Sequence, residues 1–116
     1  MRQTLGKSDR IARRLEMSRV FTQGRSATDG MVRLLVLPNS LGRSRMAVAV
    51  SSRHGSAVQR NRIKRLCREA FRTCRAELPG GFDYVMVPAV GACLNVEDLR
   101  RSLRRLAGRL IGSGER

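Results

Sequence analysis

A basic, amphipathic segment at residues 60–75 constrains the fold of this chain more than any other feature. Its apolar residues recur at intervals of three and four, the period of an α-helix with one buried face. They are Ile63, Leu66, Cys67, Ala70, Phe71 and Cys74. The opposite side carries one amide and five cations, namely Asn61, Lys64, Arg65, Arg68, Arg72 and Arg75. Such a helix packs on a core with one side and presents positive charge on the other.

The charge of the whole chain points to a polyanionic partner. The 116 residues carry 24 Lys and Arg against 9 Asp and Glu, a formal net charge of +15. An isolated domain with this surplus repels itself, so nucleic acid is the expected partner. All the cations except Lys7 and Lys64 are arginines. The planar guanidinium suits phosphates and bases, although a GC-rich genome explains the same bias equally well.

The cysteines and the apolar segments exclude several classes of protein. Cys67, Cys74 and Cys93 form no CxxC pair, and His54 is the only histidine. A zinc site therefore lacks its ligands, and the two helical cysteines are expected in the core. No segment is apolar enough to span a membrane, and no secretory signal follows the first residues. We expect a cytoplasmic protein that does not bind membranes.

The remaining pattern predicts an α+β fold in one domain covering residues 1–116, with an ordered core at about 10–110. A first helix is expected over 10–23, ended by Gly24, and residues 25–30 form a polar loop or a very short strand. Strands are expected at 31–37 and 45–51, joined as an antiparallel pair by the turn residues 38–44.

The second half repeats this alternation of helix and strand. Ser56 and Gln59 fit a capping box that opens the basic helix, which is expected to run to about Glu77. A strand follows at 83–87, and a last helix begins after the N-cap Asn95. The resulting order is α-β-β-α-β-α, a sandwich in which helices cover one face of a small sheet. The strands that flank the basic helix should pair in parallel, with a right-handed crossover as the default.

No catalytic group stands out in the sequence. His54 is the only residue that ordinarily titrates near neutral pH, and no carboxylate lies beside it in the sequence. No phosphate-binding glycine loop is present. The arginines of the last helix, at 100–109, are equally consistent with nucleic-acid binding and with a solvated face. The helix at 60–75 is a stronger candidate, because its cations begin in the first turn, where backbone N–H groups already attract phosphate.

The run from Ala57 to Arg72 resembles the signature of the bacterial ribonuclease P protein subunit. The Arg-Asn-Arg core at 60–62, followed by Lys64-Arg65 and Arg68-Glu69, is highly specific for that family. Three other stretches also resemble their counterparts in the family. They are the first helix with its closing glycine, through Arg10-Ile11 and then Val20 to Gly24, the strand at 45–51 and the strand at 83–87. The similarity covers residues 10–110.

This resemblance implies a ribosomal protein S5 domain 2-like fold with an unusual left-handed βαβ crossover. It implies a complex with a catalytic RNA that removes the 5′ leader of precursor tRNA, with Mg²⁺ held mainly by the RNA subunit and no catalytic residue or metal site in the protein. The expected partners are ribonuclease P RNA and precursor tRNA, with no obligate protein partner. The RNA-binding residues it implies are Arg53, Arg60, Asn61, Arg62, Lys64, Arg65, Arg68 and Arg72.

In the family, the leader lies in an aromatic cleft between the first helix and the sheet. The residues expected to line this cleft here are Met17, Phe21, Met31, Leu34 and Tyr84. Met17, Met31 and Leu34 stand where the family commonly has aromatic rings, and each stacked base contributes about 1–3 kcal/mol. The loop before the signature has only one basic residue, Arg53, where family members usually have lysines. The alternative function is a non-enzymatic RNA-binding protein, such as a small ribosomal protein of similar fold.

Overall fold

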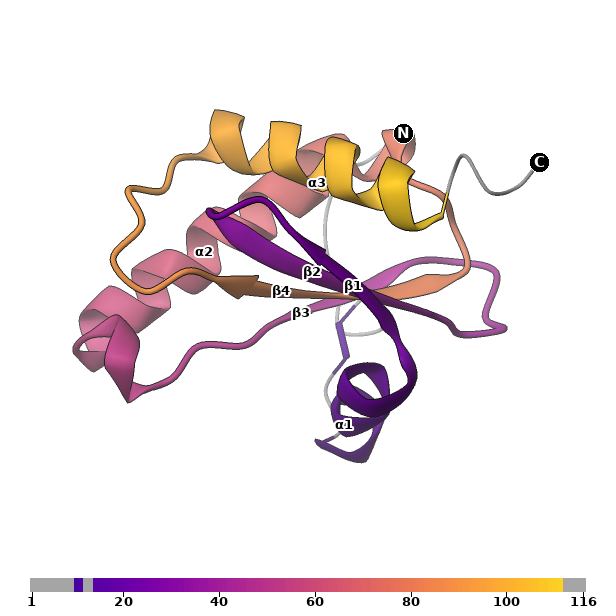
Figure 1. Cartoon of the computed structure of the whole chain (residues 1–116), viewed down its shortest axis with the longest axis horizontal. Coiled ribbons are helices and arrows are strands. Elements are labelled where there is room, and N and C mark those ends of the chain that lie inside the picture. The colour runs from indigo at the N-terminus through magenta and orange to yellow at the C-terminus, as the bar shows by residue number, and fades with distance from the viewer. Residues whose placement is uncertain (1–9, 12–13, 112–116) are drawn as a thin grey trace.

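The computed structural model describes residues 10–11 and 14–111, which form three α-helices and one four-stranded sheet (Figure 1). The helices are α1 (Arg14–Gln23), α2 (Ala57–Cys74) and α3 (Val96–Leu110). The strands are β1 (Arg25–Thr28), β2 (Val32–Pro38), β3 (Arg45–Val48) and β4 (Phe82–Pro88). The predicted α+β class is confirmed, and the segment after the first helix is the very short strand rather than the loop. The predicted order therefore lacked one strand.

The predicted antiparallel pair of β2 and β3 is wrong. The sheet order is β1-β2-β4-β3, so β4 lies between these two strands, antiparallel to β2 and parallel to β3. The reason is burial. Tyr84, Val85 and Met86 are fully buried, so β4 takes an internal position in the sheet, where both of its faces are covered and a strand pairs with each of its edges. The parallel pairing of the strands that flank the basic helix is confirmed.

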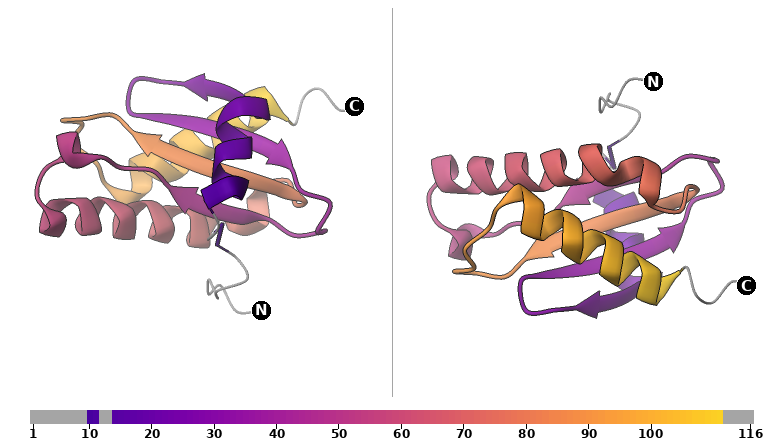
Figure 2. Two further views of the ribbon diagram at one scale, coloured as in Figure 1. Left: turned by 90° about the horizontal axis from the view of Figure 1, so that it is seen from below. Right: turned by 90° about the horizontal axis from the view of Figure 1, so that it is seen from above.

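Helices lie on both faces of the sheet, not on one as predicted (Figure 2). Side chains alternate along each strand, so β2 sends Leu34 towards α2 and α3 and sends Leu35 towards α1. The larger core lies on the α2–α3 side and includes Phe71, Tyr84 and Leu103. The smaller core lies under α1 and consists of Ile11, Val20, Leu35, Ala47 and Val85.

The ends of the helices follow the sequence closely. Ser56 caps α2: its hydroxyl accepts from the Gln59 backbone N–H at 3.2 Å, and Gln59 Oε1 accepts from the Ser56 N–H at 2.7 Å. Asn95 caps α3 by accepting from the Asp98 N–H at 2.9 Å. The basic helix ends three residues earlier than predicted, and a 3-10 turn occupies 75–77. Both predicted N-caps are thus confirmed.

Candidate RNA interface

The cations of α2 divide into those with a partner and those without one. The Arg72 Nε donates to Glu69 Oε1 at 3.1 Å, and Arg60 donates to the Gly55 carbonyl at 3.1 Å. The side chains of Arg62, Lys64 and Arg65 form no hydrogen bond or ion pair with the described part of the chain. Asn61, Arg62 and Arg65 are exposed. The helix therefore presents cations that no carboxylate of the described residues neutralises.

The apolar side of α2 is buried as the spacing predicted. Cys67, Ala70, Phe71 and Cys74 lie in the larger core. Burial raises the pKa of the Cys67 thiol to about 12 and that of Cys74 to about 11. Both thiols are therefore protonated at neutral pH, in agreement with a packing role.

A cavity of about 130 Å³ joins α2 to the first helix and to the sheet edge at β3. Arg10, Lys64 and Arg68 line it, together with Met17 and the backbone around Ala47. Burial and the nearby Arg10 guanidinium both lower the pKa of Arg68. The structure thus brings Met17, a predicted cleft residue, next to two predicted RNA-binding cations. Arg10 was not among the predicted RNA-binding residues, although Arg10-Ile11 belongs to the stretch that resembles the first helix of the family.

The loop before α2 is held by His54. The Ser51 N–H donates to His54 Nδ1 at 3.0 Å, so in the neutral ring the hydrogen lies on Nε2, which donates to the Pro88 carbonyl at 2.8 Å. Both ring nitrogens are thereby engaged with the backbone. Gly55 follows with a φ of +115°, and a Cβ there would lie 2.1 Å from Gln59 Oε1. Arg53 is exposed and lies in this loop, just before the start of α2.

The five predicted cleft residues do not lie together. Met17 packs against the smaller core and Phe21 is 41% exposed, both on α1. Leu34 and Tyr84 are completely buried in the larger core on the opposite face, and Met31 packs there too. The prediction of one shared cleft is therefore corrected: strand alternation points Leu34 and Tyr84 towards α2 and α3. The Tyr84 hydroxyl donates to the Pro79 carbonyl inside that core.

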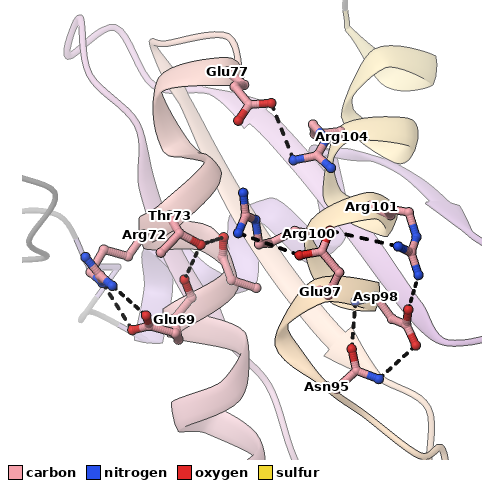
Figure 3. Close-up of polar contacts among 11 residues, drawn as sticks. Glu69, Arg72, Thr73, Glu77, Asn95, Glu97, Asp98, Arg100, Arg101 and Arg104 are labelled. Carbon is pink, nitrogen blue, oxygen red and sulfur yellow. Dashed lines mark hydrogen bonds and ion pairs between the residues drawn. The ribbon is translucent and has the colours of Figure 1, made fainter.

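The arginines of α3 are mostly paired with carboxylates (Figure 3). Arg100 and Arg101 approach Glu97, and Arg101 also pairs with Asp98. Arg104 pairs with Glu77 at 3.4 Å, and Arg105 pairs with Asp29 at 3.1 Å. Asp29 also accepts from the Ser102 hydroxyl at 2.6 Å. The contact with Glu77 holds α3 to the 3-10 turn after α2, and the contacts with Asp29 hold it to the β1–β2 turn.

Neither a metal site nor a membrane span is found in the described part of the chain. Within residues 10–11 and 14–111, no group of three or more His, Cys, Asp or Glu side chains is placed to hold a metal ion. No helix in the same ranges combines the length and the apolar character needed to cross a bilayer.

The fold and the uncompensated cations of α2 define a small α+β protein that binds polyanions. The profile of the Ribonuclease P family matches residues 5–111. The chain is 39% identical to the ribonuclease P protein component of Shouchella clausii over 102 residues, 86% of this chain and 84% of that protein. It is 37% identical to that of Dehalococcoides mccartyi over 103 residues, 88% of this chain and 84% of that protein.

A solved structure agrees with these sequence matches. The RNase P protein from Thermotoga maritima superposes with a TM-score of 0.79 at 29% identity, covering 89% of this chain and 98% of that one. The chain belongs to the family of bacterial ribonuclease P protein components. It is thus a protein subunit of the ribonucleoprotein endoribonuclease ribonuclease P, which acts in tRNA 5′ maturation.

Proposed function

We propose that α2 binds the catalytic RNA of ribonuclease P, and that the α1 side of the sheet binds the 5′ leader of precursor tRNA. The observation that carries the first part is the group of exposed, unpaired side chains at Arg62 and Arg65, beside Asn61. Unpaired cations release counterions when they meet phosphates, which is the main source of affinity for nucleic acid. The match of residues 60–72 to the family signature supports the same assignment.

The protein assists the RNA in this proposal and does not itself cleave the substrate. Mg²⁺ is assigned to the RNA subunit. Cations on α2 neutralise phosphates that otherwise need screening by free ions, so the complex should work at a lower concentration of Mg²⁺ than the RNA alone. His54 has a structural role and holds the loop that contains Arg53, because both of its ring nitrogens already form hydrogen bonds with the backbone.

The leader site is proposed for the surface beside α1, with Met17 and Phe21 at its rim. These two residues lie on the α1 side of the sheet, and Phe21 is the exposed ring there. We also propose the left-handed crossover of the family for β3, α2 and β4. The positions of these elements in Figure 2 support it, with α2 behind the sheet when α1 is in front.

The test is cleavage of a precursor tRNA by the cognate ribonuclease P RNA at low Mg²⁺, with and without this protein. Strong stimulation by the wild type, and none from the protein alone, is expected. The variant Arg62→Ala should stimulate less at equal protein concentration. Arg101→Ala, which removes an exposed arginine of α3 that pairs with Asp98, serves as the matched control. Tight RNA binding without stimulation would instead indicate a non-enzymatic RNA-binding protein.

A further inference from the structure

The face of the sheet that carries α1 is only partly covered by that helix. The cross-strand neighbours Ala47, Val85 and Leu35 lie under α1 with Val20 and are buried. One step further along the same face, the neighbours are Val87, Arg33 and Thr28. Arg33 and Thr28 are exposed and Val87 is half-buried. The left panel of Figure 2 shows α1 crossing one part of this face, with the rest of the strands open beside it.

Arg33 is an unusual residue for this position. It is the only charged residue of β2, and its neighbours along the same face, Leu35 and Leu37, pack against the smaller core. Residues two apart on a strand are about 7 Å apart, so Arg33 lies just outside the cover of α1. Its guanidinium has one polar contact among the described residues, a donation to the Ser26 hydroxyl at 3.4 Å.

No carboxylate of the described residues neutralises Arg33. The two acidic side chains on the same face, Glu16 and Asp83, both pair with Arg45. Arg33 forms no ion pair with the described residues. Arg33 is thus an exposed cation on an open sheet face, without a counter-ion in the described part of the chain. A hydroxyl at Thr28 and an aliphatic side chain at Val87 flank it, and this arrangement suits an extended anionic chain.

We infer that Arg33 binds the sugar-phosphate backbone of a single-stranded RNA segment on the open face beside α1. The inference rests on the leader site of the proposed function. It adds Arg33, on the open face of the sheet, as a cation of that site. Phe21 is the single aromatic residue of α1 and is 41% exposed, so base stacking is limited and phosphate contact takes a larger share. Binding by Arg33 is therefore independent of the leader sequence.

The experiment compares Arg33→Thr and Arg33→Lys in the reconstituted holoenzyme, with Arg101→Ala, whose guanidinium pairs with Asp98, as the control. Threonine favours strands, so Arg33→Thr removes the charge without disturbing β2. The dissociation constants of a precursor tRNA and of the same tRNA without a leader are measured over a salt series. We expect Arg33→Thr to weaken precursor binding on the order of tenfold and to lower the salt slope by about 1. Leaderless tRNA should bind unchanged, and Arg33→Lys should keep the wild-type salt slope.

The outcomes distinguish a failure of the proposed leader site from a failure of the role inferred for Arg33. If the wild type itself binds precursor and leaderless tRNA equally well, the proposed leader site is wrong. If the wild type prefers the precursor and Arg33→Thr keeps the full preference, the role of Arg33 is wrong and the leader site stands. Leaders of oligo(U) and oligo(A) complete the test, because a loss with only one of them would overturn a phosphate contact.

Discussion

The helices α2 and α3 share an amphipathic, arginine-rich character but differ in how their charges are compensated. Both are amphipathic, both are rich in arginine, and both pack against the larger core. On α3, Glu97 and Asp98 in the first turn, with the distant Glu77 and Asp29, pair with four arginines. On α2, the arginines at 62 and 65 face solvent without a carboxylate in the described part of the chain.

The difference teaches that a count of positive charges does not identify an RNA-binding helix. A cation that already pairs with a carboxylate must give up or share that contact to bind a phosphate, so its net contribution is small. An unpaired cation has no such cost and carries a counterion that binding releases. We therefore expect α2 to dominate the affinity for RNA and α3 to serve mainly the stability of the fold.

The largest expected effect tests this contrast directly. The double variant Arg62→Ala/Arg65→Ala should weaken binding to ribonuclease P RNA on the order of 100-fold, since each hydrogen-bonded charge contributes about 1.5–3 kcal/mol. The matched double variant Arg101→Ala/Arg105→Ala, on α3, removes two exposed arginines that pair with Asp98 and Asp29 and should change the affinity less than threefold. Filter binding or fluorescence anisotropy at one fixed salt concentration measures both.

Thermal unfolding supplies the control for these variants. The two α2 side chains are exposed and make no contact that the described structure needs, so the melting temperature should stay within about 2 °C of the wild type. Equal losses of RNA affinity from the α2 and α3 variants would contradict the expectation that α2 dominates the affinity for RNA.

The second prediction concerns the stabilising role of the α3 ion pairs. Asp29 accepts from the N–H groups of Met31 and Val32 and from the side chains of Ser102 and Arg105. The variant Asp29→Ala should lower the free energy of unfolding by about 2 kcal/mol, because it leaves buried donors without a partner. Urea denaturation followed by circular dichroism measures the change, and RNA affinity of the folded variant should remain close to the wild-type value.

The same carboxylate makes stability depend on pH. Burial alone raises the pKa of Asp29, but the hydrogen bonds from Ser102, Met31, Val32 and Arg105 outweigh it and lower the pKa to about 2. A lowered pKa stabilises the fold above the unfolded value of about 4, and this contribution is lost as the pH falls from about 4 towards 2. The variant Asp29→Asn should therefore show a flatter loss of stability over that range. Identical pH profiles for variant and wild type would contradict the assignment.

The third prediction uses salt to count phosphate contacts. Each of Arg62→Ala and Arg65→Ala should reduce the slope of log affinity against log salt by about 1. Arg101→Ala should leave the slope unchanged, because its guanidinium already pairs with Asp98. A reduced slope for the α3 variant would show that its ion pairs open on binding.

The smallest expected effect tests whether α3 can be made to resemble α2. Glu97 is exposed and lies 3.8 Å from Arg100 and 3.9 Å from Arg101. The variant Glu97→Gln frees Arg100, while Arg101 keeps its pair with Asp98. It should raise non-specific RNA affinity by less than threefold, at a cost of a few tenths of a kcal/mol in stability. Glu77→Gln, which releases Arg104 alone, is the comparison.

Local signals predicted the helices well and the sheet poorly. The capping residues Ser56 and Asn95 and the buried face of α2 are set by neighbours within one or two helical turns, so the sequence contains them directly. The partner of β2 depends on which strand needs burial on both faces. A turn at 38–44 does not contain that information, and the predicted antiparallel pair failed for this reason.

The candidate site shows the same division. The family signature identified the basic helix from its residue types alone, whereas the predicted cleft combined residues from two opposite faces. A shift of one residue along a strand changes the face, so Leu34 is buried against α3 while Arg33 is exposed beside α1. Arg33 carried a signal in the sequence, as the one charge within an apolar run.

The sequence by itself determined that this protein is basic, has a helix with an apolar and a cationic side, and carries the signature of its family. Those properties reside in single residues and in short-range periodicity. Only the tertiary structure decided the strand order, the face on which each residue lies and which arginines meet a carboxylate, since Asp29 and Arg105 are 76 residues apart. Charge compensation is a property of distances in space, and for that reason it separates α2 from α3 only once the chain is folded.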